Sequence, residues 1–443
     1  MPRKLFGTDG VRGVAGELVT AELALALGRA AAESCDAERP QVVIVRDTRE
    51  SGPMLEAALA AGVAAGGGDA YLAGVLPTPA ASVLVRRHGL DLAAAITASH
   101  NPWSDNGIKL FGADGRKLAD EREAEIERRV AAPGAGVRPG SAPAGRVRAL
   151  EGAGDDYLRE LASAFRLDLA GRRVALDCAN GAAYRAAPAI YERLGAEVEL
   201  IGAEPDGRNI NEGCGSTAPA ALAERVAAGG AELGFAFDGD ADRVLAVDGD
   251  GTLRDGDELL AICARHLRDA GELEGGIAVT VMSNFGFHRA MEEAGIEVAT
   301  TPVGDRHVIA ELADRDWILG GEQSGHLIWT GVGPTGDGLA ASLLVMRALA
   351  GRPLAAAVPM RKLPQVLRNV RVADRESVEG AAELWAAVER ESSGLEGRGR
   401  VLIRASGTEP LVRVMVEAPD EDECAAICER LVAVVERELG VPG

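Results

Sequence analysis

The stretch Val42-Val43-Ile44-Val45-Arg46-Asp47-Thr48-Arg49 places four apolar residues directly before a polar turn. The same order recurs at 174–183 and 277–286, where an apolar run leads through a polar or glycine-containing turn into a helical pattern. A short apolar strand, a turn and a helix make up the βα unit of a sheet that is covered on both faces. The pattern therefore predicts three α/β domains of related build, each with a mixed sheet between helices (α/β/α).

Changes in composition and periodicity divide the chain further. Residues 131–145 are rich in Ala, Pro and Gly and have little periodicity, which predicts a linker. A tight turn is expected at 248–252, and a third break falls at 359–364. Strand and helix patterns after this break predict a smaller C-terminal α+β domain. The four expected domains are 1–150, 151–250, 251–362 and 363–443.

The composition argues against several classes of partner. The 47% hydrophobic and 26% charged residues of this 443-residue chain are ordinary for a soluble globular protein. A net charge of −21 and only 3% aromatic residues oppose binding to nucleic acid and to anionic lipid. Neither nucleic acid nor a membrane is therefore expected as a partner.

The cysteines bear on the cellular compartment. Six cysteines are scattered along the chain, and Cys424 and Cys428 alone are spaced to share a helix face. No histidine or further cysteine follows them, so buried thiols are expected there rather than metal ligands. Reduced cysteines, no evident secretory signal and no apolar run of about 18 residues together predict a cytoplasmic protein.

The sharpest motif is Asp238-Gly-Asp-Ala-Asp-Arg243, which carries three carboxylates at alternate positions. Like charges this close repel unless a cation joins them. Magnesium needs oxygen ligands at about 2.1 Å in octahedral geometry, so the loop must curl inward, which Gly239 and Ala241 permit. The calcium EF-hand pattern fails, because arginine holds its sixth position and Gly249 its twelfth. We predict a metal site, with a solvated acidic turn as the alternative.

A second motif is Thr97-Ala-Ser-His-Asn-Pro102. Pro102 biases the residue before it away from helix, so Ser99 and His100 are expected in a loop at a strand end. Such ends line the binding crevice of open α/β sheets. Ser99 is either a nucleophile or phosphate carrier, or an ordinary turn serine. The chain has no Gly-x-Ser-x-Gly elbow, which argues against a serine hydrolase.

Lys109 is notable because nearly all the basic residues of this chain are arginines. Only Lys4, Lys109, Lys117 and Lys362 are lysines among the 47 basic residues. Lysine can lose its proton when its pKa is lowered, whereas arginine stays protonated. Lys109 is thus a candidate for acid–base work, with a surface lysine as the alternative.

Two further polar loops suit ligand binding. Gly321-Glu-Gln-Ser-Gly-His326 packs polar side chains between glycines, as in a site for the hydroxyls of a small polar ligand, or forms a surface turn. Arg404-Ala-Ser-Gly-Thr-Glu-Pro410, with Arg413 three residues on, concentrates hydroxyls, backbone N–H groups and guanidinium groups. This second loop favours a phosphate site.

Together, in this order and over essentially the whole chain, these motifs resemble those of the α-D-phosphohexomutase superfamily. The opening Phe6-Gly-Thr-Asp-Gly-Val-Arg-Gly13, Val303-Gly-Asp-Arg306, Ala241 and Gln323 are similar to its bacterial glucosamine branch. Mannose and glucose mutases more often carry Gly for Ala241 and Met for Gln323. The resemblance implies a heart-shaped four-domain fold. It also implies interconversion of glucosamine 6-phosphate and glucosamine 1-phosphate, on the route to UDP-N-acetylglucosamine.

The resemblance also implies ligands and residue roles. It implies Ser99 as the phosphoserine, Mg²⁺ as the cofactor, and glucosamine 1,6-bisphosphate (or glucose 1,6-bisphosphate) as intermediate or activator. The metal ligands would be Ser99, Asp238, Asp240 and Asp242. The transferring group would be surrounded by Arg12, Lys109, Arg243 and His100, with the pKa of Lys109 lowered by its cationic neighbours. The sugar hydroxyls would meet Glu322, Ser324 and His326. The non-reacting phosphate would be clamped by Arg404, Ser406, Gly407, Thr408 and Arg413.

Other functions stay open at this point. A mutase of the same build could prefer mannose or glucose phosphates. A Mg²⁺-dependent phosphatase would transfer the phosphoryl group to water, and a non-catalytic sensor would only bind the sugar phosphate. Two departures, Ala405 where many relatives have Pro and His307 where Tyr is common, flank functional residues. A monomer or a homodimer is expected.

Overall fold

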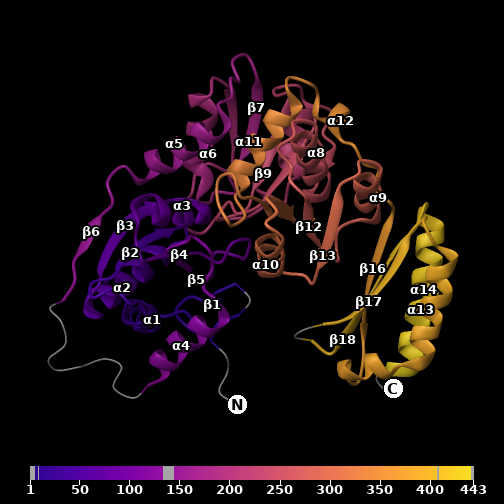
Figure 1. Ribbon diagram of the computed structural model, residues 1–443, viewed down its shortest axis with the longest axis horizontal. Helices are drawn as coiled ribbons and strands as arrows, with labels where there is room; N and C mark the ends of the chain where they lie inside the picture. The colour runs from indigo at the N-terminus through magenta and orange to yellow at the C-terminus, as the bar shows by residue number, and fades with distance from the viewer. Residues whose placement is uncertain (1–4, 8, 133–143, 407–408, 441–443) are drawn as a thin grey trace. The chain divides into compact units, whose positions relative to one another are not determined.

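The computed structural model describes residues 5–7, 9–132, 144–406 and 409–440 (Figure 1). The chain forms two compact units, residues 1–282 with 296–358, and residues 283–295 with 359–443. The first unit contains three mixed sheets, and the second contains a three-stranded antiparallel sheet. The predicted α/β class with a smaller C-terminal α+β domain is confirmed. The heart-shaped arrangement stays a prediction.

The first sheet has the strand order β1-β5-β4-β2-β3-β6. Strand β2 contains the quoted apolar run, whose four side chains are all buried, and it pairs in parallel with β3 and β4. Strand β5 runs antiparallel to β1 and β4, so the sheet is mixed. The elements are β1 (Val11–Val14), α1 (Ala21–Glu33), β2 (Gln41–Arg46), α2 (Gly52–Ala65), β3 (Asp69–Val75), α3 (Thr78–His88), β4 (Leu92–Ile96), β5 (Asp105–Gly112), α4 (Asp120–Ala131) and β6 (Val147–Ala149).

The second sheet has the order β11-β10-β9-β7-β8, with β7 parallel to its neighbours and β10 antiparallel to its own. The predicted turn at 248–252 is confirmed, since the Asp248 N–H donates to the Thr252 carbonyl at 3.0 Å between β10 and β11. The elements are α5 (Ala153–Phe165), β7 (Arg173–Asp177), α6 (Ala183–Arg193), β8 (Glu197–Ile201), α7 (Ala220–Ala227), β9 (Leu233–Phe237), β10 (Val244–Val247) and β11 (Leu253–Arg254).

The third sheet has the order β13-β12-β14-β15, again with parallel and antiparallel pairs. A capping box of Asp255 and Glu258 begins α8, and α11 is buried over most of its length. The elements are α8 (Gly256–Asp269), β12 (Gly276–Thr280), β13 (Glu297–Thr301), α10 (Asp305–Arg315), β14 (Leu319–Gly321), β15 (Leu327–Trp329), α11 (Gly338–Leu349) and α12 (Leu354–Ala357).

The second unit is built on the sheet β16-β18-β17, against which α13 and α14 pack side by side (Figure 1). Helix α9 falls inside the expected third domain but belongs to this unit, because the Phe285 N–H donates to Glu417 of β18 at 2.8 Å. The elements are α9 (Phe285–Glu293), β16 (Gln365–Arg371), η1 (Arg375–Gly380), α13 (Ala382–Gly394), β17 (Arg400–Ala405), β18 (Leu411–Glu417) and α14 (Glu421–Leu439).

Two expectations about the compartment have structural counterparts. Cys424 and Cys428 lie in the core of the second unit, where the Cys424 thiol donates to the Val416 carbonyl at 3.0 Å. Within the described residues all six cysteines are free thiols. Among the described helices, none combines the length and the apolar character needed to cross a membrane. Most of the predicted linker at 131–145 lies outside the described residues.

Candidate active site

Ser99 lies in the loop that follows β4, as the motif predicts. Its side chain is buried, and its φ of 52° lies in the left-handed region that non-glycine residues seldom adopt. The Ser99 hydroxyl donates to Asp238 Oδ2 at 2.5 Å, across 139 residues of sequence. The structure therefore brings the candidate phosphate carrier directly onto the acidic motif.

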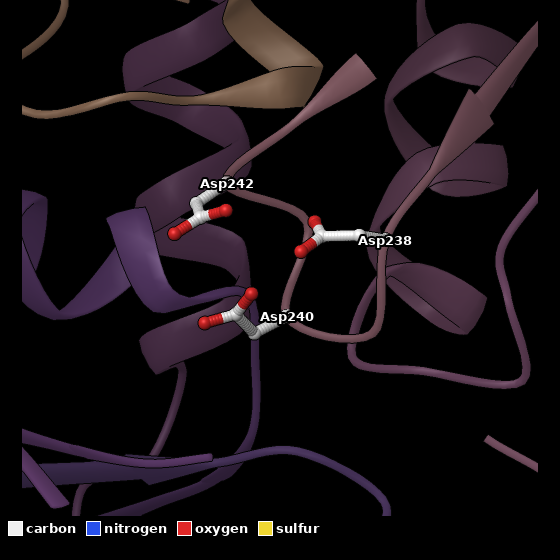
Figure 2. A group of neighbouring side chains, drawn as sticks. All are labelled: Asp238, Asp240 and Asp242. Atoms are coloured by element: carbon white, nitrogen blue, oxygen red, sulfur yellow. The ribbon is translucent and has the colours of Figure 1, made fainter. Parts of the chain in front are cut away.

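The acidic motif forms the loop between β9 and β10. Figure 2 shows the carboxylates of Asp238, Asp240 and Asp242 turned toward a common space. One ligand oxygen from each lies within 4.8 Å of the others, and all three residues are buried. Ala241 has a φ of 56°, so the loop curls at this residue. The predicted inward curl is therefore present.

The donor chemistry of this group fits a hard divalent cation. Asp240 Oδ1 and Asp242 Oδ1 are buried and have no hydrogen-bond partner. Burial and the charges of Asp242 and Asp240 raise the pKa of Asp238 well above its ordinary value. Three buried carboxylates, two of them with an unused oxygen, are costly alone, and a bound cation would offset that cost. Asp238, Asp240 and Asp242 could thus hold a metal ion.

Lys109 extends from β5 into the acidic loop. The Lys109 ammonium donates to Asp240 Oδ2 at 2.9 Å and to Asp242 Oδ2 at 3.2 Å, and it lies 3.2 Å from Asp9 Oδ2. Burial alone would lower the pKa of Lys109, but Asp240, Asp9 and Asp242 raise it well above its ordinary value. The prediction that cationic neighbours lower the pKa of Lys109 is therefore wrong, because carboxylates outnumber cations around its ammonium group.

The other predicted groups of the reaction centre lie nearby. His100 Nδ1 is 3.4 Å from the Ser99 hydroxyl, and burial together with Arg243 and Arg12 lowers the pKa of His100. Arg243 Nε lies 3.9 Å from Asp242 Oδ1 and is buried without a hydrogen-bond partner. Arg12 on β1 pairs with Asp9. Positive charge thus faces the serine and the acidic loop from two separate sheets.

The predicted sugar-binding motif is the turn between β14 and β15. The Glu322 N–H donates to the His326 carbonyl at 3.0 Å, and Ser324 is exposed at the tip of the turn. His326 itself is 3% exposed, with Nδ1 3.7 Å from Asp242 Oδ1 and Nε2 3.6 Å from Asp305 Oδ2. Glu322 is partly exposed and accepts the Gly304 N–H at its Oε1, and the ligand roles of Glu322 and Ser324 stay predictions, whereas His326 lies between Asp242 and Asp305. Its role toward a sugar hydroxyl stays a prediction.

The predicted phosphate clamp lies in the second unit. Arg404 of β17 and Arg413 of β18 are directly opposed in the register of the two strands. Burial and the charge of Arg413 lower the pKa of Arg404. Two guanidinium groups opposed in this way repel one another unless an anion joins them. Ser406 is buried beside them, and Gly407 and Thr408 lie outside the described residues.

Several residues of the site have no role in the sequence interpretation. Asp9 pairs with Arg12, Lys109 and Lys117, and Lys117 also pairs with Asp305. The Thr78 hydroxyl donates to Asp240 Oδ2 at 2.7 Å. Asp9 has a sequence signal because it lies inside the opening motif at 6–13, and Asp305 has one because it lies inside Val303-Gly-Asp-Arg306. Thr78 begins α3 and Asp305 begins α10, whereas Lys117 lies between β5 and α4, and tertiary structure brings all three to the site.

Four domain families match consecutive parts of the chain. Phosphoglucomutase/phosphomannomutase alpha/beta/alpha domains I, II and III match residues 3–135, 155–251 and 255–365, and the C-terminal domain of the same name matches residues 367–434. The chain belongs to the phosphoglucomutase/phosphomannomutase family. The resemblance seen in the motifs is therefore confirmed.

Curated relatives place the chain among the phosphoglucosamine mutases of this family. The phosphoglucosamine mutase of Desulforudis audaxviator is 52% identical over 97% of this chain and 97% of its own. That of Mycobacterium ulcerans is 51% identical over 95% of this chain and 96% of its own. The resemblance to the glucosamine branch is confirmed at this level.

Solved structures of the phosphoglucomutase/phosphomannomutase family have the same fold. A family protein from Burkholderia thailandensis matches with a TM-score of 0.84 at 25% identity, over 98% of this chain and 97% of that chain. Aspergillus fumigatus N-acetylphosphoglucosamine mutase, in complex with GlcNAc-6P and magnesium, matches with a TM-score of 0.70 at 20% identity, over 98% and 96%. At the lower identity the likeness shows the fold alone.

Proposed function

We propose that this chain is a phosphoglucosamine mutase that interconverts glucosamine 6-phosphate and glucosamine 1-phosphate through a phosphoserine at Ser99. The observation that carries the proposal is the contact of the Ser99 hydroxyl with Asp238 at 2.5 Å, inside a buried group of three carboxylates. A hydroxyl in this position can store a phosphoryl group beside a cation. The high identity to phosphoglucosamine mutases supports the amino sugar as substrate.

The reaction consists of two phosphoryl transfers. In the first, the P–O bond to Ser99 Oγ breaks, a P–O bond to the free sugar hydroxyl oxygen forms, and the proton of that hydroxyl passes to Ser99 Oγ, which yields glucosamine 1,6-bisphosphate. In the second, Ser99 Oγ forms a P–O bond to the other phosphoryl group, the bond from that phosphorus to the sugar oxygen breaks, and the Ser99 hydroxyl proton passes to the freed sugar oxygen. Isomerisation results without net loss of phosphate.

The protein mainly positions groups and neutralises charge. Asp238, Asp240 and Asp242, with an oxygen on Ser99, would hold Mg²⁺, which supplies charge neutralisation for the transferred phosphoryl oxygens. Arg12, Arg243 and Lys109 add positive charge around the serine, and His100 adds a donor. Such electrostatic positioning is the main source of rate in phosphoryl transfer.

The remaining groups would recognise the substrate. We assign Glu322 and Ser324 to the sugar hydroxyls, because both lie on a turn with unburied polar atoms. Arg404, Arg413 and Ser406, with Gly407 and Thr408, are assigned to the non-reacting phosphate. A cytoplasmic location, and a monomer or a homodimer, stay predictions that accompany this function.

The test is conversion by the purified chain with Mg²⁺ and a trace of glucose 1,6-bisphosphate, followed by phosphorus NMR. We expect glucosamine 1-phosphate to form, and kcat/KM to be highest for glucosamine 6-phosphate among the glucosamine, glucose and mannose phosphates. The Ser99→Ala variant should fold and lose almost all turnover. Release of inorganic phosphate instead of isomerised sugar would indicate a phosphatase, and a preference for mannose or glucose phosphate would indicate the other branch.

A further inference from the structure

Arg49 is an arginine that is 0% exposed, and its side-chain hydrogen bonds go to residues outside the acidic loop. It follows β2 in the polar turn at 46–49, which the sequence interpretation used only to recognise a βα unit. A buried guanidinium is expensive unless its five N–H groups are satisfied and its charge is paired. The partners of Arg49 therefore indicate what it is for.

Those partners belong almost entirely to the loop that carries Ser99. Arg49 Nε donates to Asp47 Oδ2 at 2.8 Å. One terminal nitrogen donates to the Ser99 carbonyl at 2.8 Å and to the Asn101 carbonyl at 3.0 Å. The other donates to the Asp105 carbonyl at 3.0 Å and to the Pro102 carbonyl. One side chain thus holds four carbonyl groups between residues 99 and 105.

The same ion pair holds the other backbone group of Ser99. The Ser99 N–H donates to Thr97 Oγ1 at 2.9 Å, and the Thr97 hydroxyl donates to Asp47 Oδ2 at 2.7 Å. Both the N–H and the carbonyl of Ser99 are therefore tied to the Asp47–Arg49 pair. Asn211 adds a bond from its side-chain amide to the Ser99 carbonyl at 3.0 Å.

This network explains how Ser99 keeps an unfavourable backbone conformation. A left-handed φ at a residue other than glycine is unfavourable and persists only where the surroundings over-determine it. In this left-handed conformation the Ser99 hydroxyl points at Asp238 and donates a hydrogen bond to it. Without the five donors of Arg49, the loop would relax toward ordinary backbone angles and the hydroxyl would move off the acidic group.

We infer that Arg49, together with Asp47, is a positioning residue that holds the Ser99 loop strained so that the serine oxygen faces the acidic group. The inference rests on the proposed function of Ser99 as phosphate carrier, and it assigns no contact with the sugar to Arg49. Loss of alignment by about 1 Å can cost about 10²-fold in rate. Because Arg49 is buried away from ligand, that loss falls on kcat.

The test compares Arg49→Lys with the matched control Arg46→Lys. Lysine keeps the charge opposite Asp47 but offers three donors from one point, too few for four carbonyls. Arg46 lies three residues earlier, pairs with the Glu56 carboxylate and donates to the Asp47 carbonyl, but it makes no hydrogen bond to the Asp47 carboxylate or to the Ser99 loop, so its exchange should leave the rate near that of the wild type. We expect kcat of Arg49→Lys to fall about tenfold or more while KM changes less than about threefold.

A second readout is independent of activity. Hydrogen–deuterium exchange of the segment 97–105 should be faster in Arg49→Lys than in wild type and in Arg46→Lys. If Arg49→Lys does not fold, Thr97→Val takes its place, since it removes one link of the network without exposing a buried charge. An unchanged kcat per folded molecule, or unchanged exchange, overturns the inference. If wild type and control both fail to isomerise, the proposed function fails, and exchange alone decides the positioning role.

Discussion

At the scale of single residues, Lys109 is held by three carboxylates, from Asp9, Asp240 and Asp242. Its ammonium is 1% exposed, so the space around it is shaped for a compact charge. The planar guanidinium of arginine is larger and fits such a point poorly. The residue type at this position therefore matters beyond its charge.

The Lys109→Arg variant should lose at least about tenfold in kcat, because the larger guanidinium group displaces the acidic loop. Steady-state kinetics with glucosamine 6-phosphate measures this, and Lys362→Arg at an exposed site is the matched control. Full activity of Lys109→Arg would leave Lys109 only the role of a positive charge and remove proton transfer from its tasks.

At the scale of elements, strands β17 and β18 set Arg404 directly against Arg413. The strand pairing supplies two like charges on one face, which an anionic group would stabilise. Alternation along the strands puts Arg368 of β16, paired with Val414, on the other face. The sheet thus places Arg404 and Arg413 together on one face and Arg368 on the other.

Replacement of Arg413 by alanine should raise KM for the sugar phosphate about tenfold, with a smaller effect on kcat, because a charge-assisted hydrogen bond contributes about 1.5–3 kcal/mol. The exposed Arg368→Ala variant should leave KM near the wild-type value. Equal KM values for wild type and Arg413→Ala would mean that this face does not bind the phosphate.

Helix α9 carries a pH-sensitive group. Burial and the charge of Arg400 lower the pKa of His288 to about 4, from an ordinary value near 6.5. A folded pKa below the unfolded one means that the unfolded chain binds the proton first, so stability is lost as the pH falls from about 6.5 toward 4. The loss is on the order of 2 kcal/mol, since His288 is partly exposed to solvent.

His288→Gln should therefore make the free energy of unfolding less dependent on pH in this window. Urea unfolding of the full chain at pH 5 and pH 7.5 measures the difference, with wild type as the reference. If both proteins lose the same stability between the two pH values, His288 does not cause the acid sensitivity.

At the scale of the whole molecule, the acidic group joins distant segments of the first unit. Lys109 of β5 and Thr78 of α3 both meet the loop between β9 and β10. Repulsion among three buried carboxylates strains this junction, and a cation that binds only the folded state relieves the strain. Metal binding should therefore be visible as stability of the whole first unit.

Millimolar Mg²⁺ should raise the melting temperature of wild type by about 2–5 °C over a chelator-treated sample. Sodium chloride at matched ionic strength should have less effect, and Asp240→Asn should show a smaller rise because one ligand is lost. Differential scanning calorimetry measures all three. The same rise in Asp240→Asn as in wild type would argue against metal binding by the acidic loop.

Much of the fold and part of the candidate site follow from local sequence. The buried run of β2, the turn at 248–252 and the curl at Ala241 depend on residues that are neighbours in the chain. The raised pKa of Lys109 and the approach of His326 to Asp242 do not, because the carboxylates involved lie more than 50 residues away. Local patterns carry no information about such partners.

The sequence by itself determined the fold class and the kinds of group available, because apolar periodicity and motif spacing act within a few residues. Only the tertiary structure decided that Ser99 meets Asp238, and that Arg49 holds four carbonyls of the serine loop. The physical reason is that strand ends from different sheets converge in space. Contacts between them depend on packing of whole elements, which no short stretch of sequence encodes.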